Sequence, residues 1–205
     1  MPEFEEHADA VQVMEANDDL HRLVKINEEI KKVIQISSTV NLVALNAMLI
    51  AKHSGIKSRG FAVVSSELRN FSRQLEATMN GLGSLILQLI VDTVALRKNQ
   101  MQKRHLLKVN SPTMKSVLER MDNRISASSE ISKRDWNKLR LQIHRILQLC
   151  ESGGSLSRIA KIEAVYGGET TISLKKVANQ IEMTVNEIFS SLKLLRMQLA
   201  EHEKN

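Results

Sequence analysis

Hydrophobic side chains recur every three or four residues along two long stretches of this chain. In the first stretch these positions are Leu23, Ile26, Ile30, Val33, Ser37, Val40, Ala44, Ala47 and Ala51. In the second they are Phe61, Val64, Leu68, Phe71, Leu75, Thr78, Leu82, Leu85 and Leu89. This spacing is typical of a coiled-coil seam, in which side chains of one helix enter holes on the facing helix. Because the first seam shrinks to alanine toward Gly55, we expect the helices to approach closely there.

Glycine and proline divide the chain into four segments. Breaks are predicted at Gly55–Gly60, at Asn110–Pro112 and at Gly167–Gly168. The first three segments are each about 50 residues long, and a helix of that length extends roughly 75 Å. These lengths predict a long antiparallel bundle rather than a compact globule. Four more glycines fall inside helical stretches and should soften them: Gly81, Gly83, Gly153 and Gly154.

The chain also resembles itself when it is shifted by 113 positions. Apolar residues then match apolar residues without a gap, including Ile26 with Leu139, Ile30 with Ile143, Ala47 with Ala160, Phe61 with Leu174, Leu68 with Ile181 and Leu82 with Leu195. Two heptad helices can share a seam by accident, but Gly55 also falls on Gly168, so both turns match. This favours a duplication.

The repeat predicts an all-α fold, an elongated antiparallel four-helix bundle of the coiled-coil type made of two helical hairpins. We expect a single bundle over residues 1–205. The first hairpin would span residues 1–109 with its tip at 54–58, and the second residues 113–205 with its tip at 167–171. Both tips would lie at the same end, and the bundle would be a monomer.

The composition agrees with long helices and excludes several other classes of protein. Aromatic residues make up only 3% of the chain, which argues against a β-sandwich or barrel. The longest apolar runs, around Val40–Ala51 and Leu82–Val91, are shorter than the roughly 18 residues that a membrane-spanning helix needs. A single cysteine, Cys150, cannot form an internal disulfide. With no signal-peptide pattern at the N-terminus, we expect a cytoplasmic protein without a transmembrane segment.

Neither nucleic-acid binding nor catalysis is indicated. The net charge is +6, but Lys and Arg are scattered at exposed helical positions, with the densest run at Arg97–Arg104 and no interleaved aromatics. The six histidines lack partners at metal-ligand spacing. Cys150 lies in a seam without an activating His or Asp, and Met79, Met121 and Met183 are assigned to the seams as filler. We therefore expect no enzyme activity, no metal and no cofactor.

The most informative stretch of the chain is residues 34–70. It contains Asn41-Leu-Val-Ala-Leu-Asn-Ala47 on one arm, and Arg59-Gly-Phe-Ala-Val-Val64 followed by Glu67-Leu-Arg69 on the other. These motifs resemble the hairpin tip of bacterial methyl-accepting chemotaxis receptors, the segment that docks the histidine kinase and its coupling adaptor. The resemblance implies a chemoreceptor-like signalling function.

The resemblance also implies which residues contact these partners. The partner-binding set is Asn41, Leu42, Leu45, Asn46, Leu49, Val63, Glu67 and Arg69, and the tip turns use Gly55, Arg59, Gly60 and Gly168. Leu42, Leu45, Leu49 and Val63 would form an outward apolar row, which is typical of a partner site. The spacing alone also permits these four residues to complete a crowded core. Gly60 is expected to permit a tight exit from the first turn.

The second hairpin follows the same pattern with different residues. Ile162-Glu-Ala164 and Gly168-Glu169 resemble further pieces of the receptor tip, but the descending arm from Leu174 lacks Arg-Gly-Phe. One chain would thus supply both hairpins that two receptor subunits supply, as a covalent pseudo-dimer with one degraded tip. The residues with which receptor tips assemble trimers are replaced by Ser38, Ile50 and His53.

The first hypothesis is therefore a soluble receptor-like module that binds a coupling adaptor or histidine kinase and scaffolds or modulates signalling. The alternative is a structural or interaction bundle that has lost kinase coupling, which the residues at Ser38, Ile50 and His53 favour. The retained Arg59–Val64 block favours the first hypothesis. The chain is also compatible with being one domain of a longer receptor.

Overall fold

The structure, a computed structural model, describes the backbone of residues 2–108 and 115–202. Its described part contains four long α-helices: α1 (Pro2–His53), α2 (Arg59–Leu107), α3 (Lys115–Val165) and α4 (Thr171–His202). Short 3₁₀ turns connect the helices of each pair, η1 (Gly55–Ser58) and η3 (Gly168–Thr170). The predicted break at Asn110–Pro112 lies outside the described residues.

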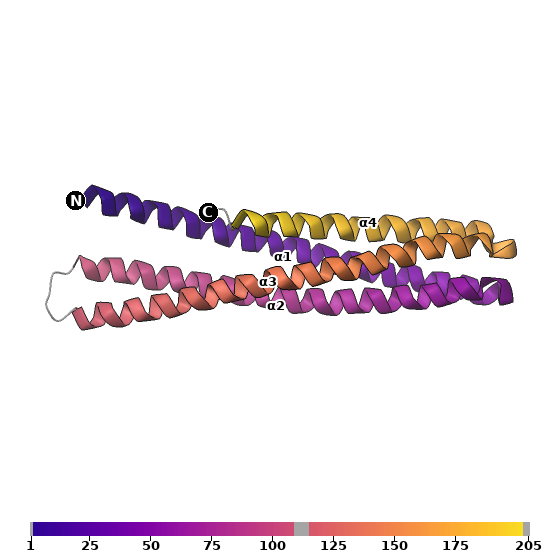
Figure 1. Ribbon diagram of the computed structural model, residues 1–205, viewed down its shortest axis with the longest axis horizontal. Helices are drawn as coiled ribbons and strands as arrows, with labels where there is room; N and C mark the ends of the chain where they lie inside the picture. The colour runs from indigo at the N-terminus through magenta and orange to yellow at the C-terminus, as the bar shows by residue number, and fades with distance from the viewer. Residues whose placement is uncertain (1, 109–114, 203–205) are drawn as a thin grey trace.

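The helices lie side by side along one long axis, and both 3₁₀ turns are at the same end (Figure 1). Contacts join α1 to α2, α2 to α3, α3 to α4 and α4 to α1, so each helix has two neighbours in a ring. This confirms the predicted antiparallel four-helix bundle of two hairpins. We call the end with the turns the tip, with tip 1 at η1 and tip 2 at η3.

The two seams read from the sequence form most of the core in the first hairpin. Every seam position from Leu23 to Ala51 is buried. In α2 the predicted seam is wrong at Thr78 and Leu85, which are only half-buried. Met79, which was assigned to a seam as filler, is buried as predicted, and Ile86 is buried in place of Leu85. There the buried positions step by four, three and four residues, through Leu75, Met79, Leu82 and Ile86, where steps of three, four and three were predicted. This rotates the buried stripe of the helix. The assignment of Met183 to a seam is also wrong, since its side chain is 73% exposed.

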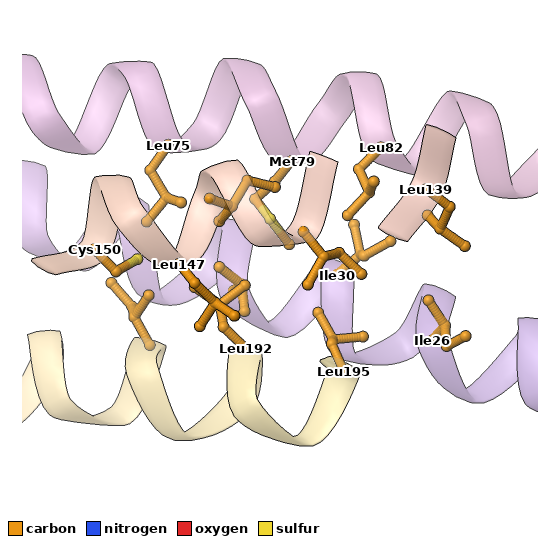
Figure 2. Packing of buried hydrophobic residues seen from close by; sticks show 14 of the residues in the cluster. Ile26, Ile30, Leu75, Met79, Leu82, Leu139, Leu147, Cys150, Leu192 and Leu195 are labelled. Atoms are coloured by element: carbon orange, nitrogen blue, oxygen red, sulfur yellow. The ribbon is translucent and has the colours of Figure 1, made fainter. Parts of the chain in front are cut away.

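Residue size divides the core into two clusters along the bundle. Away from the tip, large side chains from all four helices pack together, among them Ile30, Met79, Leu147 and Leu192 (Figure 2). Near the tip the buried residues include six small ones, Ala44, Ala47, Ala51, Ala160, Ala164 and Ala178. Small side chains let helix axes approach closely, so the tip is narrow.

The 113-residue offset seen in the sequence also relates the two hairpins in space. Gly55 and Gly168 are the glycines with positive φ, at 72° and 60° in the described chain. Each begins its 3₁₀ turn, where a left-handed backbone favours glycine. The buried seam pairs continue the match, since Ile26, Ile30 and Phe61 are buried like their counterparts Leu139, Ile143 and Leu174. An origin by duplication stays a prediction.

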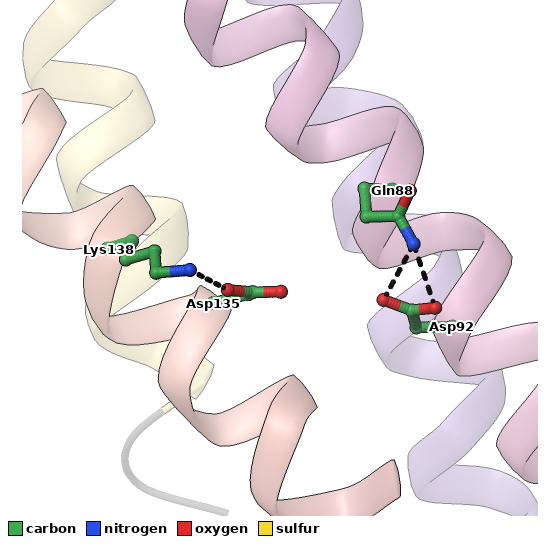
Figure 3. Close-up of polar contacts among 4 residues, drawn as sticks. All are labelled: Gln88, Asp92, Asp135 and Lys138. Atoms are coloured by element: carbon green, nitrogen blue, oxygen red, sulfur yellow. Dashed lines mark hydrogen bonds and ion pairs between the residues drawn. The ribbon is translucent and has the colours of Figure 1, made fainter.

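Polar groups mark where the apolar core ends. One helical step beyond Leu89 and Leu139, the buried residues are Thr93 and Asp135. Lys138 Nζ pairs with Asp135 Oδ1 at 2.7 Å (Figure 3). On α2, Gln88 Nε2 donates to both carboxylate oxygens of Asp92 at 3.0 and 3.1 Å. The buried carboxylate of Asp135 needs such a partner, whereas the Gln88–Asp92 pair is exposed.

The sequence predicted apolar stretches too short to span a membrane, and this prediction is wrong by the criteria of length and composition. Two helical segments of the described chain are long and apolar enough to cross a membrane. They are Asp19–His53 and Gly55–Leu107. Each contains an apolar window of 18 residues, with a mean hydropathy of 1.7 in the first segment and 1.5 in the second. Uncharged polar residues such as Asn41 and Asn46 interrupt the apolar runs without excluding such a window. The core helix of a soluble protein meets the same criteria, and 39% and 28% of the two windows are buried inside the bundle.

Candidate partner-binding surface at the tip

The two tips are joined to each other directly. Ser54 Oγ, at the end of α1, and Thr170 Oγ1, in η3, share a hydrogen bond of 2.5 Å in which either hydroxyl can donate. The hydroxyl of Thr170 also lies 2.9 Å from the carbonyl oxygen of Gly167, within its own turn. Tip 1 therefore does not stand apart as a separate loop, and a partner that binds there meets a surface already supported by tip 2.

Gly60 has a different role from the one expected. It lies in the first turn of α2 with an ordinary helical backbone, and the positive φ of this turn belongs to Gly55. A Cβ added at Gly60 would collide with the carboxylate of Glu163 from α3. Gly60 therefore permits close approach between the hairpins rather than a tight exit from the turn. The sequence motif contained this glycine, but the residue that lies over it could be identified only from the structure.

The four apolar residues predicted to face outward are all exposed. Their exposed fractions are 60% for Leu42, 36% for Leu45, 49% for Leu49 and 63% for Val63. They do not complete the core, which at this level consists of the six alanines, Phe61 and aliphatic residues such as Leu68 and Leu174. An exposed apolar row close to one end of a bundle is the kind of surface that another protein can cover.

The eight predicted binding residues lie on three sides of the tip rather than on one flat patch. Arg69 Nε donates to Asn41 Oδ1 at 3.2 Å, which ties α2 to α1 on one side. Asn46 and Leu49 line a groove of about 530 Å³ between α1 and α4. Glu67 lines another groove, of about 430 Å³, between α2 and α3.

Val63 lies between Gly60 and Glu67 at helical spacing and so shares the side of α2 that meets α3. The row of leucines on α1 and the side chain of Val63 therefore face different ways around tip 1. A partner that contacts both must reach around the outer face of the first hairpin.

The ascending arm of tip 1 carries no charge over a long stretch. Between Lys32 and Lys52 the chain contains no Asp, Glu, Lys or Arg. Charged residues reappear at the turn, where Lys52 and Arg59 line a hollow of about 280 Å³ together with Ile56. The surface of the arm thus offers apolar contact and amide hydrogen bonds, while the turn offers positive charge.

The second hairpin also contributes to this surface, although no motif in the sequence pointed to it. Ser173, Lys176, Val177 and Gln180 of α4 line the groove that holds Asn46 and Leu49. The 113-residue offset could have indicated them, because Ser173 and Lys176 correspond to Gly60 and Val63.

The described part of the chain contains no group of three or more His, Cys, Asp or Glu side chains that could hold a metal ion. Burial raises the pKa of the Cys150 thiol to about 12, so this sulfur stays protonated and unreactive at neutral pH. What the tip does present is the exposed side chains of Leu42, Leu49 and Val63 and the amide group of Asn41, which suit apolar and amide contacts with another protein.

Comparison with known proteins connects this surface to one family. The model of the methyl-accepting chemotaxis protein signalling domain matches residues 4–147. The match includes the first hairpin from residue 4 onward and ends on α3 before tip 2.

Several curated proteins are similar to part of the chain. A putative methyl-accepting chemotaxis protein of Synechocystis is 34% identical over 76 residues, which cover 35% of this chain and 8% of that protein. The methyl-accepting chemotaxis protein TlpQ of Pseudomonas aeruginosa is 33% identical over 81 residues, 38% of this chain and 11% of its own length. PctB of the same species is 35% identical over 68 residues, 33% of this chain and 11% of PctB. The matched part of this chain thus spans about a tenth of the length of these relatives.

Proposed function

We propose a function for this chain from the family to which it belongs, that of the methyl-accepting chemotaxis protein signalling domain. It is a receptor-like signalling module whose tip 1 binds a chemotaxis coupling adaptor or histidine kinase. The family is a non-enzymatic signalling module, and its signalling domain is cytoplasmic. The observation that carries the proposal is the exposed apolar row of Leu42, Leu45 and Leu49 on an arm without charge. These residues sit beside the Arg59–Val64 motif, on the family-matched hairpin.

The proposed mechanism is non-covalent. The partner would cover apolar surface on α1 and Val63 on α2, and the removal of this surface from water would drive association. Asn41 would stay oriented by Arg69, so its amide group is held in place before the partner arrives. The module would scaffold or modulate the kinase as a cytoplasmic monomer, without a cofactor or nucleic acid.

The test compares two exposed apolar residues that differ in their distance from tip 1. Val63, which is 63% exposed, is changed to Lys, and Leu141 on α3, which is 59% exposed, receives the same change as a control. Binding to the purified coupling adaptor and to the regulatory domain of the kinase is measured by titration calorimetry. We expect Val63→Lys to weaken binding at least about tenfold, equivalent to about 1.4 kcal/mol, and Leu141→Lys to leave it unchanged. Equal effects of both variants, or wild-type protein that does not bind, would contradict the proposal.

The second candidate is a structural bundle that has lost kinase coupling. It is favoured by Ile50, which replaces the charged residue of receptor tips and packs against the tip-side core. An apolar side chain there strengthens the bundle and removes a polar contact for neighbouring receptors. A wild-type protein that binds neither adaptor nor kinase, yet folds stably, is the result that this candidate predicts.

A further inference from the structure

The chain presents two tips that correspond position by position but differ in chemistry. We propose that tip 2 is silent and that the molecule is therefore monovalent, binding one partner where a symmetrical bundle of two tips would bind two. This inference rests on the proposed function of tip 1. It goes beyond that function by stating how many partner molecules one chain can bind.

The correspondence of the tips follows from the helices and turns. The 113-residue offset places the start of α3 on the start of α1 and Gly168 on Gly55. It also gives each residue of the exposed row on tip 1 a counterpart on the second hairpin. Leu42 corresponds to Ser155, Leu45 to Arg158, Leu49 to Ile162 and Val63 to Lys176.

Three of these four counterparts are polar or charged. Ser155, Arg158 and Lys176 are exposed on the second hairpin. Ser155 and Lys176 also border the grooves that hold Glu67 and Asn46 of the first hairpin. Ile162 alone keeps the apolar character, with 59% of its side chain exposed. An apolar partner surface that fits the leucines would have to remove two positive charges from water to fit here.

The polar replacement is an organised contact. Arg158 Nη2 donates to Ser155 Oγ at 2.9 Å, so the two residues at the places of Leu45 and Leu42 bond to each other. A partner on this face would displace or bury that bond without offering an equivalent one. The cost of an unmatched polar group opposes binding more strongly than the loss of apolar contact alone.

The pair that orients Asn41 on tip 1 is missing on tip 2. Its members Asn41 and Arg69 correspond to Gly154 and Glu182. Glu182 carries the opposite charge and pairs with Lys161 at 2.5 Å. The second hairpin therefore lacks the amide and the guanidinium group and presents a different ion pair at the same level.

A monovalent module has a different effect on an assembly from a divalent one. A bundle with two working tips can connect two partners and so extend a network, whereas one with a single working tip occupies a partner and connects nothing further. We infer that the chain acts as a cap on assemblies of its partner rather than as a link in them.

The experiment counts partners per chain. Wild-type protein, of 23.1 kDa, is mixed with increasing coupling adaptor, and the mass of the complex is measured by light scattering after gel filtration. The triple variant Ser155→Leu, Arg158→Leu, Lys176→Val gives tip 2 the residues of tip 1. Because Lys176 also lines the groove of Asn46 and Leu49, and Ser155 that of Glu67, Arg158→Leu alone is the matched control that leaves both grooves unchanged. The reciprocal variant Leu45→Arg, Val63→Lys gives tip 1 the residues of tip 2.

We expect one adaptor per wild-type chain, two per triple variant and none per reciprocal variant. Two adaptors per wild-type chain would overturn the monovalence and leave the proposed function standing. No binding by the wild type would overturn the proposed function and the monovalence with it. A folded triple variant that still binds one adaptor would show that these three residues do not silence tip 2. If the triple variant fails to fold, as judged by circular dichroism, the wild-type mass decides the question.

Discussion

The carboxylate of Glu163, on α3, lies over the backbone of Gly60, on α2, so closely that no side chain could stand between them. The contact joins the two hairpins next to both turns. It is not repeated by symmetry, because the corresponding residues of the other pair are Ile50 and Ser173. The tip is therefore asymmetric at this contact.

The coupling free energy between Gly60 and Glu163 can be measured with a double-mutant cycle. Gly60→Ala should gain helix propensity of about 1 kcal/mol, but in the wild type part of that gain is lost because the end of Glu163 must move. In a Glu163→Ala background nothing has to move, so the same change should stabilise by its full amount. Unfolding in urea, followed by circular dichroism, gives the four free energies. Equal effects in both backgrounds would mean that the two residues do not interact.

Two other glycines should respond to alanine in opposite directions. A Cβ at Gly153 would run into the ring of Phe71, which is buried, whereas a Cβ at Gly81 meets nothing within 4 Å. Gly153→Ala should therefore destabilise the bundle by about 1–3 kcal/mol through overpacking. Gly81→Ala should stabilise it by about 0.5–1 kcal/mol, because the helix loses less backbone entropy. Thermal unfolding of both variants is the measurement, and destabilisation by Gly81→Ala would show that the glycine serves a need for flexibility.

Ser37 and Ser72 form a reciprocal pair in the core between α1 and α2. Ser37 Oγ donates to the carbonyl oxygen of Ser72 at 2.8 Å, and Ser72 Oγ donates to that of Ser37 at 2.5 Å. Either residue changed to Ala should cost about 1 kcal/mol. The double variant should cost less than the sum, because the second hydroxyl has already lost its neighbour. Additive losses in urea unfolding would argue against a coupled pair.

Cys150 should be unreactive in the folded protein. Burial raises the pKa of its thiol from 9.0 to about 12, so a reagent that needs thiolate should label it slowly at pH 8 and rapidly in urea. The raised pKa also predicts a pH effect on stability. Below pH 9 the thiol is protonated in both states, and between pH 9 and 12 only the unfolded state loses its proton, so stability falls as pH rises.

The control for this prediction is Cys150→Ala. Lysine side chains also titrate above pH 9, so only the difference in slope between wild type and variant reports on the thiol. The wild type should lose stability more steeply over this range. Identical slopes, or rapid labelling under native conditions, would show that the sulfur reaches solvent.

Sequence periodicity was sufficient for the fold because a coiled-coil seam is a local pattern with a global consequence. Leu23 to Ala51 are spaced so that they face one side of a helix in any context, and only packing against other helices can remove that side from water. The turns at Gly55 and Gly168 were equally readable, since a positive φ favours glycine. The prediction of the seam was wrong at Thr78 and Leu85. The neighbouring Met79 and Ile86 offer an alternative apolar stripe, and which stripe is buried depends on the facing helices.

The candidate partner-binding surface could be predicted only in part from the sequence. The resemblance to receptor tips placed Leu42, Leu45, Leu49 and Val63 on the outside, where their spacing alone also permitted core positions. Their distribution around the tip depends on which helix lies next to which. A linear motif cannot show that Asn46 shares a groove with Lys176, because these residues are on α1 and α4.

The amino-acid sequence by itself determined the helices, the turns, the seam of the first helix and the family to which the chain belongs, because each depends on residues close together in the chain. Tertiary structure decided which hairpin faces which, that Glu163 covers Gly60, and that Arg158 bonds to Ser155 where tip 1 has leucines. The physical reason is that contacts between helices depend on axial register and rotation. These are set by the fit of all four seams at once and by no single segment.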